Sequence, residues 1–161
     1  GVNIEGRAAF SEWAELQAGF TWQDSRYKEP EKWSEDESVP AESRMFRSPD
    51  SYAYITATVT PVRRFDISLT GNYTGRMLVQ HFAGYVETDV AVLTNPFFDM
   101  GLKLSYDFKI YRSIGLQING GVKNIFNAYQ KDFDKGPDRD AGYIYGPSLP
   151  RTIFVGAKLS F

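Results

Sequence analysis

The 161-residue chain contains no cysteine and a single histidine, His81. It therefore has no disulfide, no thiol chemistry and no cysteine-based zinc site, and a metal site or proton relay that needs two histidines is excluded. No apolar run approaches the roughly 18 residues that a membrane-spanning helix needs. An excess of one charge is also lacking, since 18 basic and 20 acidic residues nearly balance. A nucleic-acid-binding protein would show a basic excess, so we expect no nucleic-acid partner.

Catalytic signatures are missing as well. The sequence has no G-x-S-x-G segment, no phosphate-binding loop and no dinucleotide fingerprint. Neighbouring carboxylates such as Asp132 and Asp134 could be drawn as a glycosidase pair, but no pattern around them indicates a pocket. We therefore predict that the chain is not an enzyme and that it carries no cofactor.

Aromatic residues, in contrast, make up 16% of the chain, and apolar residues alternate with polar ones along much of it. The alternation is strictest over 97–110, which predicts a strand with one apolar and one polar face. In 52–60 the apolar face is ambiguous, because Ala53 and Ile55 compete with Tyr52 and Tyr54. We expect seven strands, at 2–11, 16–23, 52–60, 65–80, 97–110, 114–124 and 151–161.

The connections between these strands alternate in length. Short connections fall at 11–14, 61–64 and 111–113, and long ones at 28–50, 81–96 and 127–150. Strands joined in this way predict an all-β, antiparallel up-and-down meander that forms a β-barrel or part of one. All long loops then lie at one end of the sheet and all tight turns at the other.

Alternation alone does not say whether the apolar face meets a core or lipid, because a soluble barrel turns it inward and a membrane barrel turns it outward. Four features favour a membrane: unequal loop lengths, polar faces with similar numbers of acids and bases, an aromatic last residue, and aromatic residues at both strand ends. The two predicted aromatic girdles consist of Trp13, Phe65, Phe108 and Phe161 at the tight turns, and of Trp22, Tyr27, Tyr73 and Phe97 at the long loops.

Two segments near the C-terminus resemble the end of TonB-dependent outer-membrane receptors. They are GVKNIFN at 121–127 and LPRTIFVGAKLSF at 149–161. The loop segments 129–137 and 142–147 resemble variants from Bacteroidetes-type bacteria. The resemblance implies a 22-stranded barrel with an N-terminal plug in the outer membrane of a Gram-negative bacterium. Such a receptor takes up a scarce, bulky nutrient, which here would be a ferric siderophore, cobalamin or a glycan.

The resemblance also implies partners. Phe161 matches the terminal aromatic that the barrel-assembly machinery reads in this family, and Leu159 and Val155 continue the same apolar stripe. Outer-membrane lipid and the nutrient are further partners, and TonB would act through an N-terminal region that this sequence lacks. Seven strands account for all 161 residues, so we expect residues 1–161 to be the C-terminal part of a receptor barrel. Isolated in water, this part should close on itself or dimerise through its open edges.

Three loop features are candidate sites. Acidic residues alternate from Asp132 to Asp140 and suit Ca²⁺, but the pattern departs from an EF-hand, and a solvated loop with internal ion pairs is the favoured interpretation. Trp33 lies in the long charged loop 28–50, where it could stack on a ligand ring or pack locally. His81 has no partner at catalytic spacing and is expected to be exposed. The glycosylation sequon at Asn72 is taken as chance, because it lies inside a strand.

Two other hypotheses remain open at this stage. The chain could be a small soluble barrel of the lipocalin kind, with its apolar faces turned inward around a hydrophobic ligand. It could also be a complete eight-stranded membrane barrel, although that needs one more strand than the pattern predicts.

Overall fold

A computed structural model describes residues 1–111 and 113–161. Strands, turns and irregular segments make up this part of the chain, which includes no helix long and apolar enough to cross a membrane. The strands are β1 (Val2–Phe10), β2 (Ala14–Trp22), β3 (Arg26–Glu31), β4 (Glu42–Arg44), β5 (Ser51–Val62), β6 (Phe65–Thr74), β7 (Leu78–His81), β8 (Val90–Leu93), β9 (Phe97–Tyr111), β10 (Ile114–Lys123) and β11 (Thr152–Ser160).

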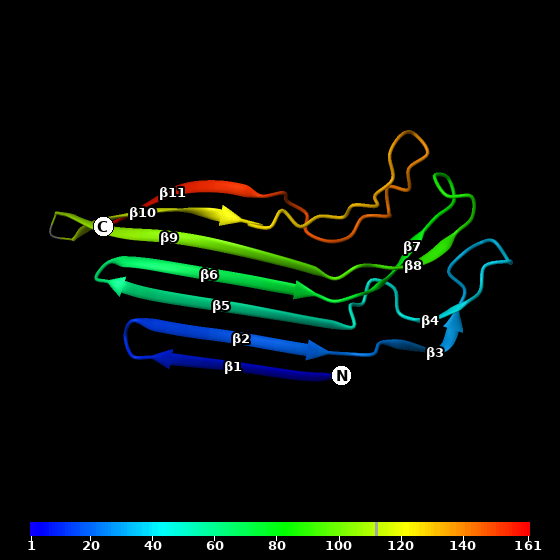
Figure 1. The fold of residues 1–161 in the computed structure, drawn as a ribbon, viewed down its shortest axis with the longest axis horizontal. Coiled ribbons are helices and arrows are strands. Elements are labelled where there is room, and N and C mark those ends of the chain that lie inside the picture. Colours follow the sequence, from blue (N-terminus) through cyan, green and yellow to red (C-terminus); the bar gives the residue numbers. More distant parts are fainter. Residues whose placement is uncertain (112) are drawn as a thin grey trace.

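Seven of these strands form one antiparallel sheet in the order β1-β2-β5-β6-β9-β10-β11. Each strand pairs with the next one of the sheet along the chain, which confirms the predicted up-and-down meander. In Figure 1 the tight turns lie at one end of the sheet, and the three long connections gather at the other. The predicted turn at 111–113 includes residue 112, which lies outside the described residues.

The predicted strand 65–80 is wrong in its second half. Strand β6 ends at Thr74, and Gly75 donates its N–H to the Ser51 carbonyl over 2.7 Å, where the chain leaves the sheet. Residues 78–81 then form β7, which pairs with β8 in a separate two-stranded sheet. Leu78 and Val79 are consecutive and both buried, so this segment packs on two faces and does not continue the one-sided pattern of β6. The long loop 28–50 likewise contains an unpredicted pair, β3 and β4.

The register places all apolar faces on one side of the sheet. In its middle, Leu69 of β6 lies between Ala57 of β5 and Leu102 of β9. The sequence left the apolar face of β5 ambiguous. The pairing decides it, because Ile55 lies opposite Ala18 of β2 and Gly71 of β6. Its tyrosines and threonines therefore belong to the polar face. A slip by one residue in any strand would turn its apolar set to the wrong side, so the register is strongly specified.

The sheet has no hydrophobic core of its own. On the apolar face Val155 remains 82% exposed, and beyond the last strand Phe161 is 89% exposed. The buried apolar side chains all belong to the long connections at one end of the sheet: Leu78, Val79, Tyr143 and Tyr145. The described chain is thus an exposed, two-sided sheet that carries a small packed body at its loop end.

The expected self-closure does not occur. Strands β1 and β11 stand at opposite ends of the strand order and do not pair with each other. Figure 1 shows the two edge strands on opposite margins of an open sheet. Seven strands leave β1 and β11 each with one unpaired edge in this sheet. Dimerisation through these edges stays a prediction.

The close approach of β9 and β10 at Gly121 gives a test of the register. A Cβ there would overlap the Leu102 carbonyl oxygen and lie 3.0 Å from the Lys103 Cα, whereas a Cβ at Gly6 of β1 meets nothing within 4 Å. We expect Gly121→Ala to lower the free energy of unfolding by roughly 1–3 kcal/mol, because the backbone must move. Gly6→Ala should leave it unchanged or slightly higher. Urea unfolding in detergent, followed by tryptophan fluorescence, measures both, and equal effects would contradict the register.

Candidate functional site

The three long connections are joined to one another at the loop end of the sheet. Arg47, in the first connection, donates its backbone N–H to the Leu78 carbonyl in the second over 2.7 Å. Its guanidinium donates to the carbonyl oxygens of Ile144 and Gly142 in the third, over 3.1 and 2.5 Å. A single arginine therefore bonds to both other connections, and it does so through backbone carbonyls.

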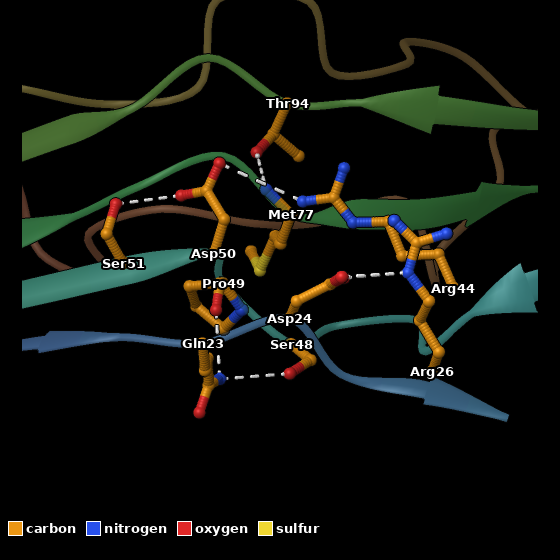
Figure 2. A network of polar contacts seen from close by, with 10 residues as sticks. All are labelled: Gln23, Asp24, Arg26, Arg44, Ser48, Pro49, Asp50, Ser51, Met77 and Thr94. Carbon is orange, nitrogen blue, oxygen red and sulfur yellow. Dashed lines mark hydrogen bonds and ion pairs between the residues drawn. The ribbon is translucent and has the colours of Figure 1, made fainter. Parts of the chain in front are cut away.

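A polar network holds the base of the first two connections (Figure 2). The Gln23 amide donates to Ser48 Oγ and to the Pro49 carbonyl, over 3.1 and 2.9 Å. Arg44 lies 3.8 Å from the Asp50 carboxylate, and the Ser51 hydroxyl donates to the same group over 2.8 Å. These bonds fix the chain where it leaves β2 and returns to β5, so the loop starts from a rigid base.

Apolar packing between the second and third connections forms the only cluster of buried apolar side chains within the described residues. Val79, 1% exposed, packs with Tyr143 and Tyr145, and Met77, Val92 and Phe97 surround them. The Phe97 ring meets Tyr145 edge-on, with their centroids 5.6 Å apart. Phe97 was predicted for an aromatic girdle, but it faces this cluster, and its neighbour Phe98 lies on the apolar face next to Phe126, 6.0 Å away.

His81 is buried, not exposed as the sequence predicted. Only 6% of it is accessible, its ring stacks on Tyr143 with centroids 3.8 Å apart, and its Nε2 lies 2.9 Å from Asp134 Oδ2. A carboxylate can only accept, so Nε2 carries the proton of this bond. The partner lies 53 residues further along the chain. Sequence spacing gives no sign of such a pair, which explains the wrong expectation.

The acidic segment from Asp132 to Asp140 is organised by hydrogen bonds. Asp132 accepts from the hydroxyls of Tyr143 and Tyr145, over 2.9 and 2.5 Å. Asp134 accepts from His81 and from the backbone N–H of Asp140, and Asp140 in turn accepts from the N–H of Phe82. The expected ion pairs within this loop are not formed among the described residues. Nor does this part of the chain contain a group of three or more His, Asp or Glu arranged to hold a metal ion.

These contacts shift three pKa values. Burial raises the pKa of the Asp132 carboxyl, but the bonds from Tyr145 and Tyr143 outweigh it, so the net pKa lies below its ordinary value. Burial, followed by the bond to Asp132, raises the pKa of Tyr143 to about 12. The same two causes raise the pKa of Tyr145 further. Asp132 is thus held ionised and both phenols are held protonated, which keeps both hydroxyls as donors.

Trp33 lies in the first connection, among the packed loops at the same end of the sheet, and is half-buried. Its ring contacts Phe46 and Phe82, with centroids 5.3 and 6.1 Å away, and its indole N–H donates to the Pro40 carbonyl over 3.2 Å. Next to it, the Ser34 hydroxyl donates to Asp89 over 2.6 Å and joins the first connection to the second. Trp33 therefore packs locally, and its role in ligand binding stays a prediction.

A hollow of about 420 Å³ opens beside the tyrosine pair. Aromatic rings, an ammonium group and a carboxylate line it, from Phe97, Tyr129, Lys131, Asp132 and Tyr145. Its volume falls within the roughly 300–1,000 Å³ of small-ligand sites. This lining can stack on a ring and form charged hydrogen bonds, and its Asp132–tyrosine bonds hold it in shape.

The residues of the predicted assembly signal lie apart from this site. Val155 and Leu159 point from β11 to the exposed apolar face, and Phe161 follows the end of that strand. The exposure of all three leaves them accessible to a partner. Recognition by the barrel-assembly machinery stays a prediction.

The pKa of Asp132 gives a pH test. Because its pKa is lowered in the folded loop, the stability it contributes is present at neutral pH and is lost only as the pH falls through that lowered value. The tyrosine bonds should therefore survive acidification through about pH 4, where an ordinary aspartate protonates. NMR titration of ¹³C-labelled carboxyl carbons and of the Tyr145 amide measures this. Asp132→Asn, which removes the titrating carboxyl, identifies the Asp132 signal, and a titration midpoint of Asp132 at or above about pH 4 would contradict the arrangement.

Comparisons with known proteins concern the fold. No protein-family model matches the chain, and no curated protein matches it. Among solved structures, the chain is similar to the closed form of the ferric-catecholate import receptor Fiu from Escherichia coli K12, with a TM-score of 0.66 and 20% identity. The match covers 99% of this chain and 20% of the receptor, so the chain spans about a fifth of that protein's length. This likeness shows that the seven-stranded meander has the fold of a segment of a β-barrel receptor.

Proposed function

We propose that the chain is the C-terminal barrel segment of a TonB-dependent outer-membrane receptor, and that the whole receptor imports a scarce, bulky nutrient. The observation that carries this proposal is the continuous apolar face, which runs in register across all seven strands and stays exposed. Monomeric soluble proteins rarely expose a continuous apolar face to water. Lipid covers it in a membrane barrel.

The charges support this orientation. Arg7 pairs with Glu15 over 2.8 Å, and Asp66 accepts from Thr60 over 2.6 Å, all from residues of the polar face. On the apolar face the seven strands carry no charged residue among the described positions. One side is thus suited to hydrocarbon and the other to a water-filled interior. A lipocalin-like barrel would instead enclose the apolar face, which needs a closed sheet.

In this proposal the chain has no catalytic role. The polar face forms part of the lumen wall, and a plug domain and the TonB contact belong to other parts of the receptor. The joined connections face the outside and take part in ligand capture through the hollow beside Tyr145 and through Trp33. A ferric siderophore, cobalamin or a glycan would suit, and a ferric catecholate is the first to test, because the similar receptor is named for importing it.

The membrane-facing side can be tested with two neighbouring residues at the middle of β6. Leu69 belongs to the apolar face, and Thr70 to the polar face, between Thr56 and Gly101. We expect Leu69→Lys to lower the free energy of unfolding in lipid by about 2–4 kcal/mol, the cost of a lysine at the bilayer midplane. Thr70→Lys should cost much less. Guanidinium unfolding in vesicles measures the difference, and equal costs would mean that Leu69 does not meet lipid.

Transport is tested on the parent gene. We expect its open reading frame to encode a plug region upstream of this segment, and its deletion to abolish growth on a ferric catecholate as the only iron source while growth on ferrous iron is unchanged. The same assay with cobalamin and with glycans identifies the nutrient if the catecholate fails. A parent gene without an upstream plug region would overturn the proposal.

A further inference from the structure

We propose that His81 and Asp134 form a buried ion pair, which holds the second and third connections together while the histidine is protonated and releases them as the pH rises. The pair is a property of this chain and does not depend on transport. Its consequence for ligand capture rests on the proposed function, because the same part of the loops supports the hollow beside Tyr145.

The Asp134 carboxylate is buried without a full set of hydrogen bonds. Its side chain is 1% exposed, and that of His81 is 8% exposed. One oxygen, Oδ2, accepts from His81 Nε2 and from the Asp140 N–H, each over 2.9 Å. The other oxygen, Oδ1, is buried and accepts no hydrogen bond from the described part of the chain. An ionised carboxylate in such a place is costly unless an opposite charge compensates it.

His81 is the group that can supply this charge. Within the described residues, no lysine or arginine forms an ion pair with Asp134 or with Asp140. A neutral Asp134 is disfavoured, because Oδ2 accepts two bonds and a hydrogen on Oδ1 would have no acceptor among these residues. An imidazolium, in contrast, compensates the carboxylate through the bond from Nε2. This bond is stronger when both groups are charged than when the ring is neutral.

The other titratable side chains around the ring are acidic or neutral. Tyr143 stacks on His81 with the two planes 3° apart, and its hydroxyl donates to Asp132. Asp140 accepts from the backbone N–H that follows His81 in the chain. On the side of β8, Asp89 directly precedes the residue that pairs with His81. These carboxylates add to the attraction that a charged ring experiences.

The hollow is connected to this pair through Tyr143. The Tyr143 ring stacks on His81, and its hydroxyl donates to Asp132, which lines the hollow together with Tyr145. When the second and third connections separate, one of the two hydroxyls that hold Asp132 loses its support. The wall of the hollow is then less well fixed, so ligand capture should weaken.

Loss of the ring proton weakens the pair without breaking its hydrogen bond. A neutral His81 still donates from Nε2, but Asp134 then has no counter-charge. The stability that the pair contributes is thus present while the ring is charged, and it is lost as the pH rises and the ring becomes neutral. A histidine ordinarily changes its charge between about pH 5 and 8. We therefore expect the two connections to separate more often at the alkaline end of this range.

NMR of the full chain in detergent tests the pair directly, because His81 is the only histidine and its ¹⁵N-labelled ring gives an unambiguous signal. We expect a charged ring at about pH 5.5 and a neutral one at about pH 8. Over this range the Phe82 and Asp140 amides should lose at least about tenfold of their hydrogen-exchange protection, corrected for the intrinsic rate. The Thr60 amide, which donates to the Trp13 carbonyl at the tight-turn end, should keep its protection.

Variants separate the charge from the hydrogen bond. His81→Gln keeps an N–H that can donate to Asp134 but carries no charge, so the Phe82 amide should be weakly protected at both pH values. Glu87→Gln, at an exposed site in the second connection, is the matched control and should keep the wild-type pH dependence. If His81→Gln does not fold, Asp134→Asn serves as the second variant and should make the protection independent of pH.

Three results would overturn the inference: a ring whose charge does not change over this range, equal protection at both pH values in the wild-type protein, or the same pH dependence in His81→Gln. None of these measurements involves transport, so they leave the proposed receptor function intact. A parent gene without an upstream plug region would, in turn, remove the consequence for ligand capture and leave the ion pair unaffected.

Discussion

The rest of the structure depends on the register of strand pairing, which decides the side of the sheet on which each side chain lies. Each strand alternates its two faces with a period of two residues, and the ladder between Leu16, Ala57, Leu69 and Leu102 keeps every apolar set on one side. The sheet has no second layer to pack against, so no core corrects a misplaced strand. Backbone hydrogen bonds and cross-strand contacts hold the sheet together. Its apolar face has to be covered by an apolar medium that lies outside the chain.

Tertiary packing is found at the loop end instead. Tyr143 and Tyr145 bury their rings against Val79 and use their hydroxyls on Asp132, while His81 is held between Tyr143 and Asp134. The molecule is thus divided into an extended sheet that depends on its environment and a compact loop body that is ordered by its own contacts. Such a division fits the proposed function, in which the sheet meets lipid and the loops present a fixed surface to a ligand.

The sequence predicted the sheet well, because a period of two is a local signal. Seven strands in the predicted order are found, with long connections between β2 and β5, β6 and β9, and β10 and β11, although the strand predicted over 65–80 ends at Thr74. The error at 65–80 arose because alternation continued past Gly75 by coincidence, whereas residues 78–81 pair with β8 in a separate sheet and bury both Leu78 and Val79. The loop body could not be predicted. Its defining contacts, such as His81 with Asp134 and Arg47 with Gly142, join residues 53 and 95 positions apart.

The two bonds of the Arg47 guanidinium to the third connection have a consequence for how such proteins diversify. The acceptors are the carbonyl oxygens of Gly142 and Ile144, which any residue at those positions can supply as long as the backbone keeps its path. Substitutions of the exposed Ile144 should therefore keep this anchor, whereas a graft of one connection from another protein would change the backbone path and detach it. Chimeras that exchange all three connections together should keep the anchor, because its donor and both acceptors then move as one set.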